Sequence, residues 1–161
     1  MAMADDVRSE VVFESVALDH PEGRALEDRL KAEMSTRYGG PGPGAVPIEH
    51  FDPPQGLFVI ALLDGVPVAC GGFRYLRPQV AEIKRLSVDP SARGFGIGRR
   101  LLAFLERQAA AAAYGHLWLE TGTEQPEAMA LFTAAGYRPM DPYGQFKLDH
   151  RSRCFCRTVG S

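Results

Sequence analysis

A glycine-rich turn between a strand and a helix constrains the fold of this chain more than any other segment. Residues 88–102 read Val-Asp-Pro-Ser-Ala-Arg-Gly-Phe-Gly-Ile-Gly-Arg-Arg-Leu-Leu, with Gly94, Gly96 and Gly98 at alternating positions. Without side chains, these positions let a ligand approach the backbone N–H groups closely. A helix N-terminus adds unpaired N–H groups and a partial positive charge, and the neighbouring arginines add full charges. The segment therefore favours a loop that binds a pyrophosphate.

Two common phosphate-binding motifs do not match this segment. The dinucleotide motif requires Gly-x-Gly-x-x-Gly with an acidic residue about 20 positions later, whereas these glycines follow the pattern Gly-x-Gly-x-Gly. The P-loop requires Gly-Lys followed by Ser or Thr, a triplet that the sequence lacks. The remaining alternative is a helix entry without a ligand. In that case the glycines would weaken the helix start by about 1 kcal/mol each relative to Ala, with no compensation.

The overall composition is that of one soluble globular domain. The chain has 161 residues, of which 45% are hydrophobic and 24% charged, with a formal net charge of −2. We expect a single domain over residues 1–161, with a flexible segment at 1–7. The balanced charge disfavours a nucleic-acid partner, because phosphate backbones select strongly basic faces. Apolar runs are far shorter than the roughly 20 residues of a membrane span, so we expect a cytoplasmic protein without membrane contact.

The cysteine and histidine content predicts neither a disulfide framework nor a metal site. Cys70, Cys154 and Cys156 form an odd set with one close pair. Only His150 lies near that pair in the sequence, which leaves too few ligands for zinc. The histidines are scattered and suggest no nucleophilic triad. We therefore expect no bound metal.

Periodicity and turn signals predict a mixed α/β (α+β) order of strands and helices. We expect strands at residues 8–18, 57–63, 66–77, 79–88, 116–120, 143–148 and 153–159. We expect helices at residues 19–37, 94–113 and 126–135, with Asp19 as a possible cap of the first. The Gly- and Pro-rich loop over residues 39–55 is the most flexible-looking segment of the sequence.

Four segments, taken in order, resemble the GNAT superfamily of N-acetyltransferases. The motif Arg93-x-x-Gly96-x-Gly98 resembles the family's acyl-CoA pyrophosphate loop. Residues 82–88 and 117–121 resemble its fourth and fifth strands, and residues 128–137 resemble its next helix and turn. The resemblance covers nearly the whole chain. It implies the GNAT fold, which is a mixed central β-sheet of about seven strands with flanking helices, splayed between the fourth and fifth strands.

The resemblance also implies which residues bind the coenzyme. The pantetheine arm would pair with backbone groups of Leu86, Ser87 and Val88, between the splayed strands. The loop's N–H groups, together with the Arg99 side chain, would hold the pyrophosphate. The loop residues implied are Arg93, Gly94, Phe95, Gly96, Ile97 and Gly98. Arg100 would either reach the 3′-phosphate or point to water. Gln125 stands where the family often has an Asn that assists the pantetheine or the acceptor, and Phe132 lies on the same helix.

Acetyl transfer to an amine requires a group that removes a proton, and Glu82 is the leading candidate. Several family members place a glutamate there that acts through water, and burial can raise a carboxyl pKa toward the working pH. The alternative for Glu82 is a surface salt bridge to Lys84 or Arg74. Strand alternation places Glu82 and Lys84 on the same face, which makes this alternative credible.

The leaving thiolate raises a second question, because many family members protonate it with a tyrosine. The matching position here is Phe132, which has no proton to donate. Tyr137 and Tyr143 are the candidate donors in its place. Otherwise the thiolate leaves unaided, which its pKa of about 8.5 allows.

The sequence therefore predicts an acyltransferase that moves an acetyl group directly from acetyl-CoA to a primary amine of a small molecule, amino acid or peptide. Tyr38, Arg74 and Glu120 are the candidate residues on the acceptor side. A non-catalytic acyl-CoA sensor is the alternative, and O-acetyl transfer is a third possibility. We expect a monomer or homodimer.

Overall fold

A computed structural model describes residues 11–39 and 47–160. Two expectations fall outside the described residues, namely the flexibility of residues 1–7 and the part of the 39–55 loop at residues 40–46. No helix among the described residues is long and apolar enough to cross a membrane.

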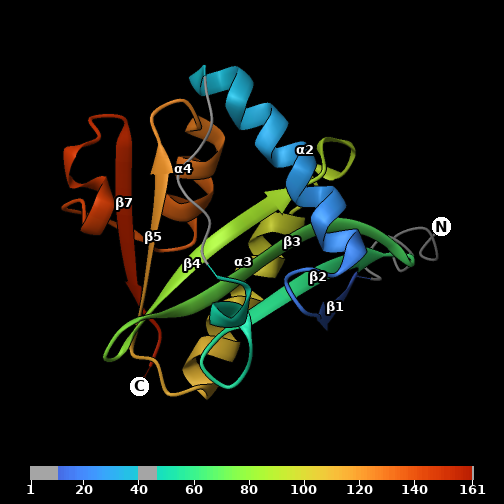
Figure 1. Cartoon of the computed structure of the whole chain (residues 1–161), viewed down its shortest axis with the longest axis horizontal. Helices are drawn as coiled ribbons and strands as arrows, with labels where there is room; N and C mark the ends of the chain where they lie inside the picture. Colours follow the sequence, from blue (N-terminus) through green and yellow to red (C-terminus); the bar gives the residue numbers. More distant parts are fainter. Residues whose placement is uncertain (1–10, 40–46, 161) are drawn as a thin grey trace.

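The described chain forms one seven-stranded mixed sheet with helices on both faces (Figure 1). The strands are β1 (Val11–Ser15), β2 (Leu57–Leu63), β3 (Val66–Arg77), β4 (Val80–Val88), β5 (His116–Gly122), β6 (Arg138–Met140) and β7 (Ser152–Thr158). The helices are α2 (Pro21–Tyr38), α3 (Ile97–Ala111) and α4 (Pro126–Ala134), with short 3₁₀ turns η1 (Ile48–Phe51), η2 (Pro90–Ala92) and η3 (Gly144–Leu148). The spatial order is β1-β2-β3-β4-β5-β7-β6, which confirms the predicted fold.

The sheet splits between its only parallel pair of described strands. Residues Val80–Ile83 of β4 pair with His116–Leu119 of β5, and the pairing stops there although both strands continue. Figure 1 shows the two strands diverging from this closed end, with the C-terminal end of α2 near the open end. The split leaves backbone groups of the second half of β4 without a strand partner on that side.

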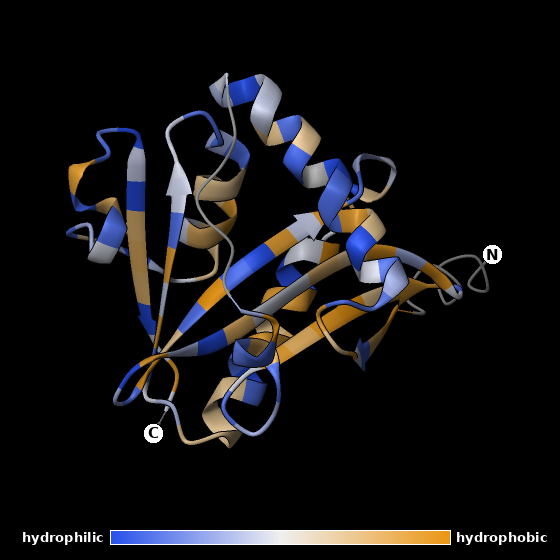
Figure 2. Ribbon diagram, viewed as in Figure 1, coloured by the Kyte–Doolittle hydropathy of each residue, from blue (hydrophilic) through white to orange (hydrophobic). Residues whose placement is uncertain are grey.

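Two apolar layers hold the sheet between the helices. Leu101, Leu102 and Leu105 of α3 are fully buried on one face, because their helical spacing forms a continuous apolar stripe. On the other face Leu26 of α2 packs in a second cluster with Phe58 and other buried residues. Figure 2 shows the difference in composition, since α3 and the central strands are largely hydrophobic while α2 is mostly hydrophilic.

One strand prediction is wrong. The segment predicted as a strand at residues 143–148 is the 3₁₀ turn η3, which begins where Gly144 takes a left-handed φ of 56°. The edge position beside β7 is filled by β6, whose three residues include Pro139. Proline is tolerated in an edge strand, but it obscures the strand signal in a segment this short.

Two helices begin later than predicted. Helix α3 starts at Ile97, because Gly94 and Gly96 have φ values of 86° and 77° that a right-handed helix cannot include. Helix α2 is capped by His20 instead of Asp19, with the His20 Nδ1 accepting a hydrogen bond from the Glu22 N–H at 3.3 Å.

Candidate active site

A bulge in β4 marks the point where the sheet opens. The pairing with β3 changes register between Cys70 and Gly72, so that β4 carries an extra residue. Arg85 lies at this irregularity with a φ of 62°, a conformation that non-glycine residues rarely adopt. A bulge re-aims the backbone groups beside it, here those of Leu86 within the stretch of β4 that has no partner in β5.

A buried ion pair anchors this bulge to α2. The Arg85 guanidinium donates to the carboxylate of Glu27, whose side chain is 9% exposed. Burial raises the pKa of Glu27, and the charge of Arg85 opposes that rise. The Arg85 guanidinium also lies 5.7 Å from the centre of the Phe51 ring. The strained residue is therefore held from the α2 face of the sheet.

The glycine loop after β4 has the shape that a phosphate group requires. Gly94 and Gly96 both have left-handed φ values, and a Cβ atom at either would meet nothing within 4 Å. The loop thus faces open space with a backbone that favours glycine. Gly96 caps α3 without a side chain, and no acidic residue lies in the first turn, so the first N–H groups of the helix remain available to an anion. The residues present fit a pyrophosphate.

The Arg93 side chain turns away from this loop toward α2. Its Nη1 and Nη2 atoms donate to the two carboxylate oxygens of Glu33 at 3.1 and 2.7 Å, and its Nε donates to the Val88 carbonyl at 3.0 Å. Arg37 also donates to Glu33, at 2.9 Å, and pairs with Glu127 at the start of α4. These four charged residues form a chain of ion pairs from the loop through α2 to α4.

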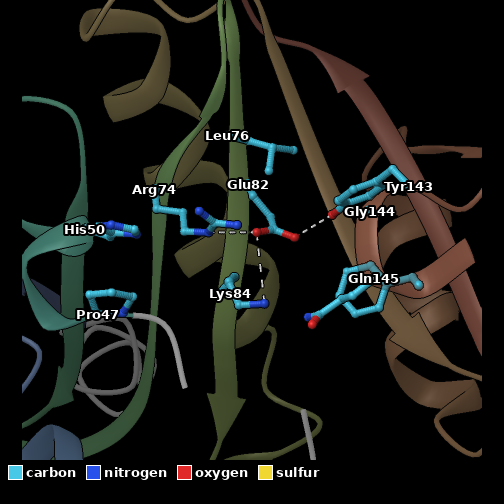
Figure 3. A pocket seen from close by; sticks show the side chains of 10 residues that line it. Pro47, His50, Arg74, Leu76, Glu82, Lys84, Tyr143, Gly144 and Gln145 are labelled. Atoms are coloured by element: carbon cyan, nitrogen blue, oxygen red, sulfur yellow. Dashed lines mark hydrogen bonds and ion pairs between the residues drawn. The ribbon is translucent and has the colours of Figure 1, made fainter. Parts of the chain in front are cut away.

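Glu82 lies at the centre of the candidate chemistry. It stands opposite Arg74 in the β3–β4 register, and its side chain is 2% exposed. The Arg74 Nε donates to Oε1 at 2.9 Å, the Tyr143 hydroxyl donates to Oε2 at 2.7 Å, and the Lys84 ammonium lies 4.0 Å from Oε1 (Figure 3). The salt bridge weighed from the sequence is therefore present, but it is buried.

A cavity of about 410 Å³ opens in front of these groups. Its walls come from η1 and the residue before it, from β3 and β4, and from the segment around η3 (Figure 3). The polar side chains of Arg74, Glu82 and Lys84 line it together with His50 and Gln145. This volume suits a small molecule.

The two tyrosines proposed as acids lie in different environments. Tyr143 contacts Glu82, and its pKa is raised by burial and by the negative charge of that carboxylate. Tyr137 packs against Phe132 in the main core, where burial and the nearby Glu106 raise its pKa. Phe132 is itself 5% exposed and also packs against Phe155. The structure brings Tyr143 to the cavity and leaves the other two in the core.

Of the three acceptor-side candidates, Tyr38 and Glu120 are not in the lining of the cavity. Tyr38 at the end of α2 accepts hydrogen bonds from the Glu124 N–H at 3.1 Å and from the Gln125 side chain at 3.2 Å. Glu120 on β5 accepts from the Ser152 hydroxyl at 2.8 Å, and burial raises its pKa. Arg74 does line the cavity.

Several residues of the site were not selected from the sequence. His50, Gln145 and Phe146 enter the cavity from segments that carry no motif. The Glu27–Arg85 pair joins positions 58 residues apart. One signal was available, because Arg85 interrupts the inward face of a strand where an unpaired charge would be costly.

These features together define an acyltransferase: a mixed sheet split beside a bulged strand, followed by a glycine loop at a helix start. A model of the acetyltransferase (GNAT) family matches residues 23–137. The chain belongs to this family, which confirms the resemblance found in the sequence.

Individual relatives agree with this assignment. An IAA acetyltransferase of Azospirillum brasilense is 38% identical over 125 residues, covering 77% of this chain and 82% of the relative. A Klebsiella pneumoniae structure named for a proposed acyl-CoA N-acyltransferase activity has a TM-score of 0.82 at 26% identity, covering 93% of this chain and 98% of that one. A GNAT acetyltransferase of Elizabethkingia anophelis with acetyl-CoA bound has a TM-score of 0.69 at 16% identity, covering 94% and 99%.

Proposed function

We propose that this protein is an acetyl-CoA-dependent N-acetyltransferase that acts on a primary amine of a small molecule, amino acid or peptide. One observation carries the proposal. A buried carboxylate, Glu82, lines a small-molecule cavity on the strand whose bulge opens the sheet. The family and the glycine loop support the coenzyme, and the volume of the cavity supports a small acceptor.

The chain's own residues would bind and orient the coenzyme. Backbone groups of Leu86, Ser87 and Val88 pair with the pantetheine arm, while N–H groups of residues 93–98 and the Arg99 side chain hold the pyrophosphate. When bound, the coenzyme supplies an acetyl group activated as a thioester. The N–H beside the Arg85 bulge donates to the acetyl carbonyl oxygen, where negative charge develops. Gln125, whose side chain donates to the Tyr38 hydroxyl, would assist the pantetheine or the acceptor.

Glu82 would take the proton from the acceptor amine through a water molecule. Arg74 and Tyr143 fix the position of its carboxylate, and each carboxylate oxygen retains capacity for a further hydrogen bond. Tyr143 acts here as a positioning residue, because its proton is already engaged with Glu82. The thiolate then leaves without an acid, since a thiol pKa of about 8.5 makes it a sufficient leaving group.

The test is thiol release from acetyl-CoA with a panel of amines, comparing wild type with Glu82→Gln. We expect Glu82→Gln to lower kcat by roughly 100- to 10,000-fold, the usual contribution of a positioned base. Coenzyme binding, measured by calorimetry, should persist and so report an intact fold. Glu14→Gln, on exposed β1 at the far edge of the sheet, is the matched control and should retain full activity.

Two outcomes would contradict the proposal. Full activity of Glu82→Gln would remove the carboxylate from the reaction. Binding of acetyl-CoA with no thiol release above background, for any amine, would instead favour a non-catalytic acyl-CoA sensor.

A further inference from the structure

The cavity beside Glu82 carries an excess of positive charge. Among its described lining residues, Arg74 and Lys84 are cations and Glu82 is the sole carboxylate. Glu120 lies nearby on β5 outside the lining, with its carboxylate engaged by Ser152. An acceptor that was only a cation would meet two like charges and one opposite charge. The cavity therefore suits a molecule that also brings a negative group.

Of the two cations in the lining, Lys84 is the one that does not donate a hydrogen bond to Glu82. Both oxygens of Glu82 already accept short hydrogen bonds, from Arg74 and Tyr143. The Lys84 ammonium stands 4.0 Å from Oε1, which is too far for a hydrogen bond. It lies 5.7 Å from the centre of the ring of Phe146, which also lines the cavity. Because Lys84 lines the cavity, its ammonium could donate to a carboxylate bound there.

We propose that the acceptor is an amino acid whose carboxylate is bound by Lys84 while its amine faces Glu82. This inference rests on the proposed function. The ammonium of Lys84 and the carboxylate of Glu82 present opposite charges 4.0 Å apart. An α-amino acid carries its amine and carboxylate on the same carbon atom, so the two groups are close together. Its carboxylate can therefore face the Lys84 ammonium while its amine faces the Glu82 carboxylate. A simple amine matches only half of the arrangement.

The apolar part of the lining, which lies beside the polar side chains of His50 and Gln145, favours an apolar side chain on that amino acid. Leu76, Phe146 and Pro47 contribute apolar surface to the same cavity. A cavity of about 410 Å³ can accommodate such a side chain, and it is small for an extended peptide. A free amino acid therefore fits better than an internal lysine of a folded protein.

The experiment compares matched acceptors that differ only in the carboxylate. Phenylalanine, leucine and methionine are each tested against the corresponding α-amide, with thiol release from acetyl-CoA as the measurement. For wild type we expect at least one acid to be acetylated with a kcat/KM about 10- to 100-fold above its amide, the range expected for a hydrogen-bonded ion pair.

Substitution of Lys84 supplies the second comparison. Lys84→Met should lower kcat/KM for the acid more than for its amide, by about the same factor, whereas Lys84→Arg should restore the preference for the acid. Lys147→Met is the matched control, since Lys147 is exposed on η3 outside the lining, and it should behave as wild type.

Three results would overturn the inference. They are equal kcat/KM values for acids and amides, an equal loss for both in Lys84→Met, and no activity on any acid while other amines are acetylated. In these cases the proposed function would still stand. The absence of thiol release with every amine would instead defeat the proposed function itself.

Discussion

Arg85 has an unfavourable backbone conformation, and its side chain is fixed by contacts with neighbouring elements. Its φ of 62° costs of order 1–3 kcal/mol for a non-glycine residue. The ion pair with buried Glu27 of α2 and the contact with Phe51 of η1 hold the side chain in place. The carboxylate of Glu27 on α2 thus fixes the side chain of the residue at which β4 bulges.

The glycine loop yields a prediction at the same scale. Gly96→Val should weaken CoA binding by more than tenfold, measured by calorimetry, because a side chain would fill the open space before the N–H groups and strain a φ of 77°. Gly65→Val is the control, since Gly65 has a φ of 82° with equally open surroundings in the β2–β3 hairpin. It should lose stability without losing affinity. Equal affinity in the two variants would remove the loop from coenzyme binding.

For Glu82, the sequence predicts the face of the strand on which the side chain lies, but not its burial or its hydrogen bond to Tyr143. Strand alternation placed Glu82 and Lys84 on one face, and the structure agrees. Its depth and its bond to Tyr143 were not predictable, because Tyr143 lies 61 positions away on a segment expected to be a strand. Local patterns indicate the direction of a side chain, whereas its partners depend on the tertiary packing of distant segments.

At the scale of elements, the C-terminal half of α2 connects the parts that would surround the coenzyme. Glu33 binds Arg93 of the glycine loop, Arg37 binds Glu127 of α4, and Tyr38 accepts from the turn before α4. The hydrogen bonds from Arg93 lower the pKa of Glu33, so this carboxylate remains charged. The Arg93 side chain is thus engaged by α2, while the glycines of the loop face open space.

Removing the ion pair between Glu33 and Arg93 should weaken the attachment of the glycine loop to α2. Glu33→Gln should weaken CoA binding by less than about fivefold, since partly exposed ion pairs contribute about 0.2–1 kcal/mol. The difference from wild type should shrink as ionic strength rises, because salt screens such pairs. Glu22→Gln, at the exposed start of the same helix, is the control. Tighter CoA binding by Glu33→Gln would contradict this role and indicate that Glu33 competes with phosphate for Arg93.

The elements themselves were predictable where their signals were long and periodic. The bounds of β2 and β3 match the prediction, since an Asp-Gly turn separates two apolar runs. The error at residues 143–148 has a local cause, because Gly144 permits a turn in a segment whose aromatic residues resemble a strand. The charged residues of α2 gave no sign of their partners, since these lie in the glycine loop and in α4.

For the whole molecule, the order of elements and the resemblance were enough to predict the sheet and its split. They did not predict that Glu82 and Lys84 of β4 and Glu120 of β5 come close enough to interact electrostatically. Burial raises the pKa of Glu120 from 4.5, although the Ser152 hydrogen bond opposes the change. The folded chain therefore retains this proton at pH values where the unfolded chain has already lost it.

The contribution of Glu120 to the stability of the folded chain therefore depends on pH. The stability contributed by neutral Glu120 is fully present below the unfolded pKa of about 4.5 and is lost as pH rises through the higher folded pKa. Glu120→Gln keeps a neutral side chain and an oxygen that can accept from Ser152. The free energy of unfolding of both proteins is measured with urea between about pH 4 and pH 7. The value for Glu120→Gln should increase relative to that of wild type as pH rises, because wild type alone loses the contribution of neutral Glu120. Other titrating groups, including Glu27, are common to both proteins. Their contributions cancel when the two free energies of unfolding are subtracted. A difference that stays constant over this range would show that Glu120 has the same pKa in the folded and unfolded chains.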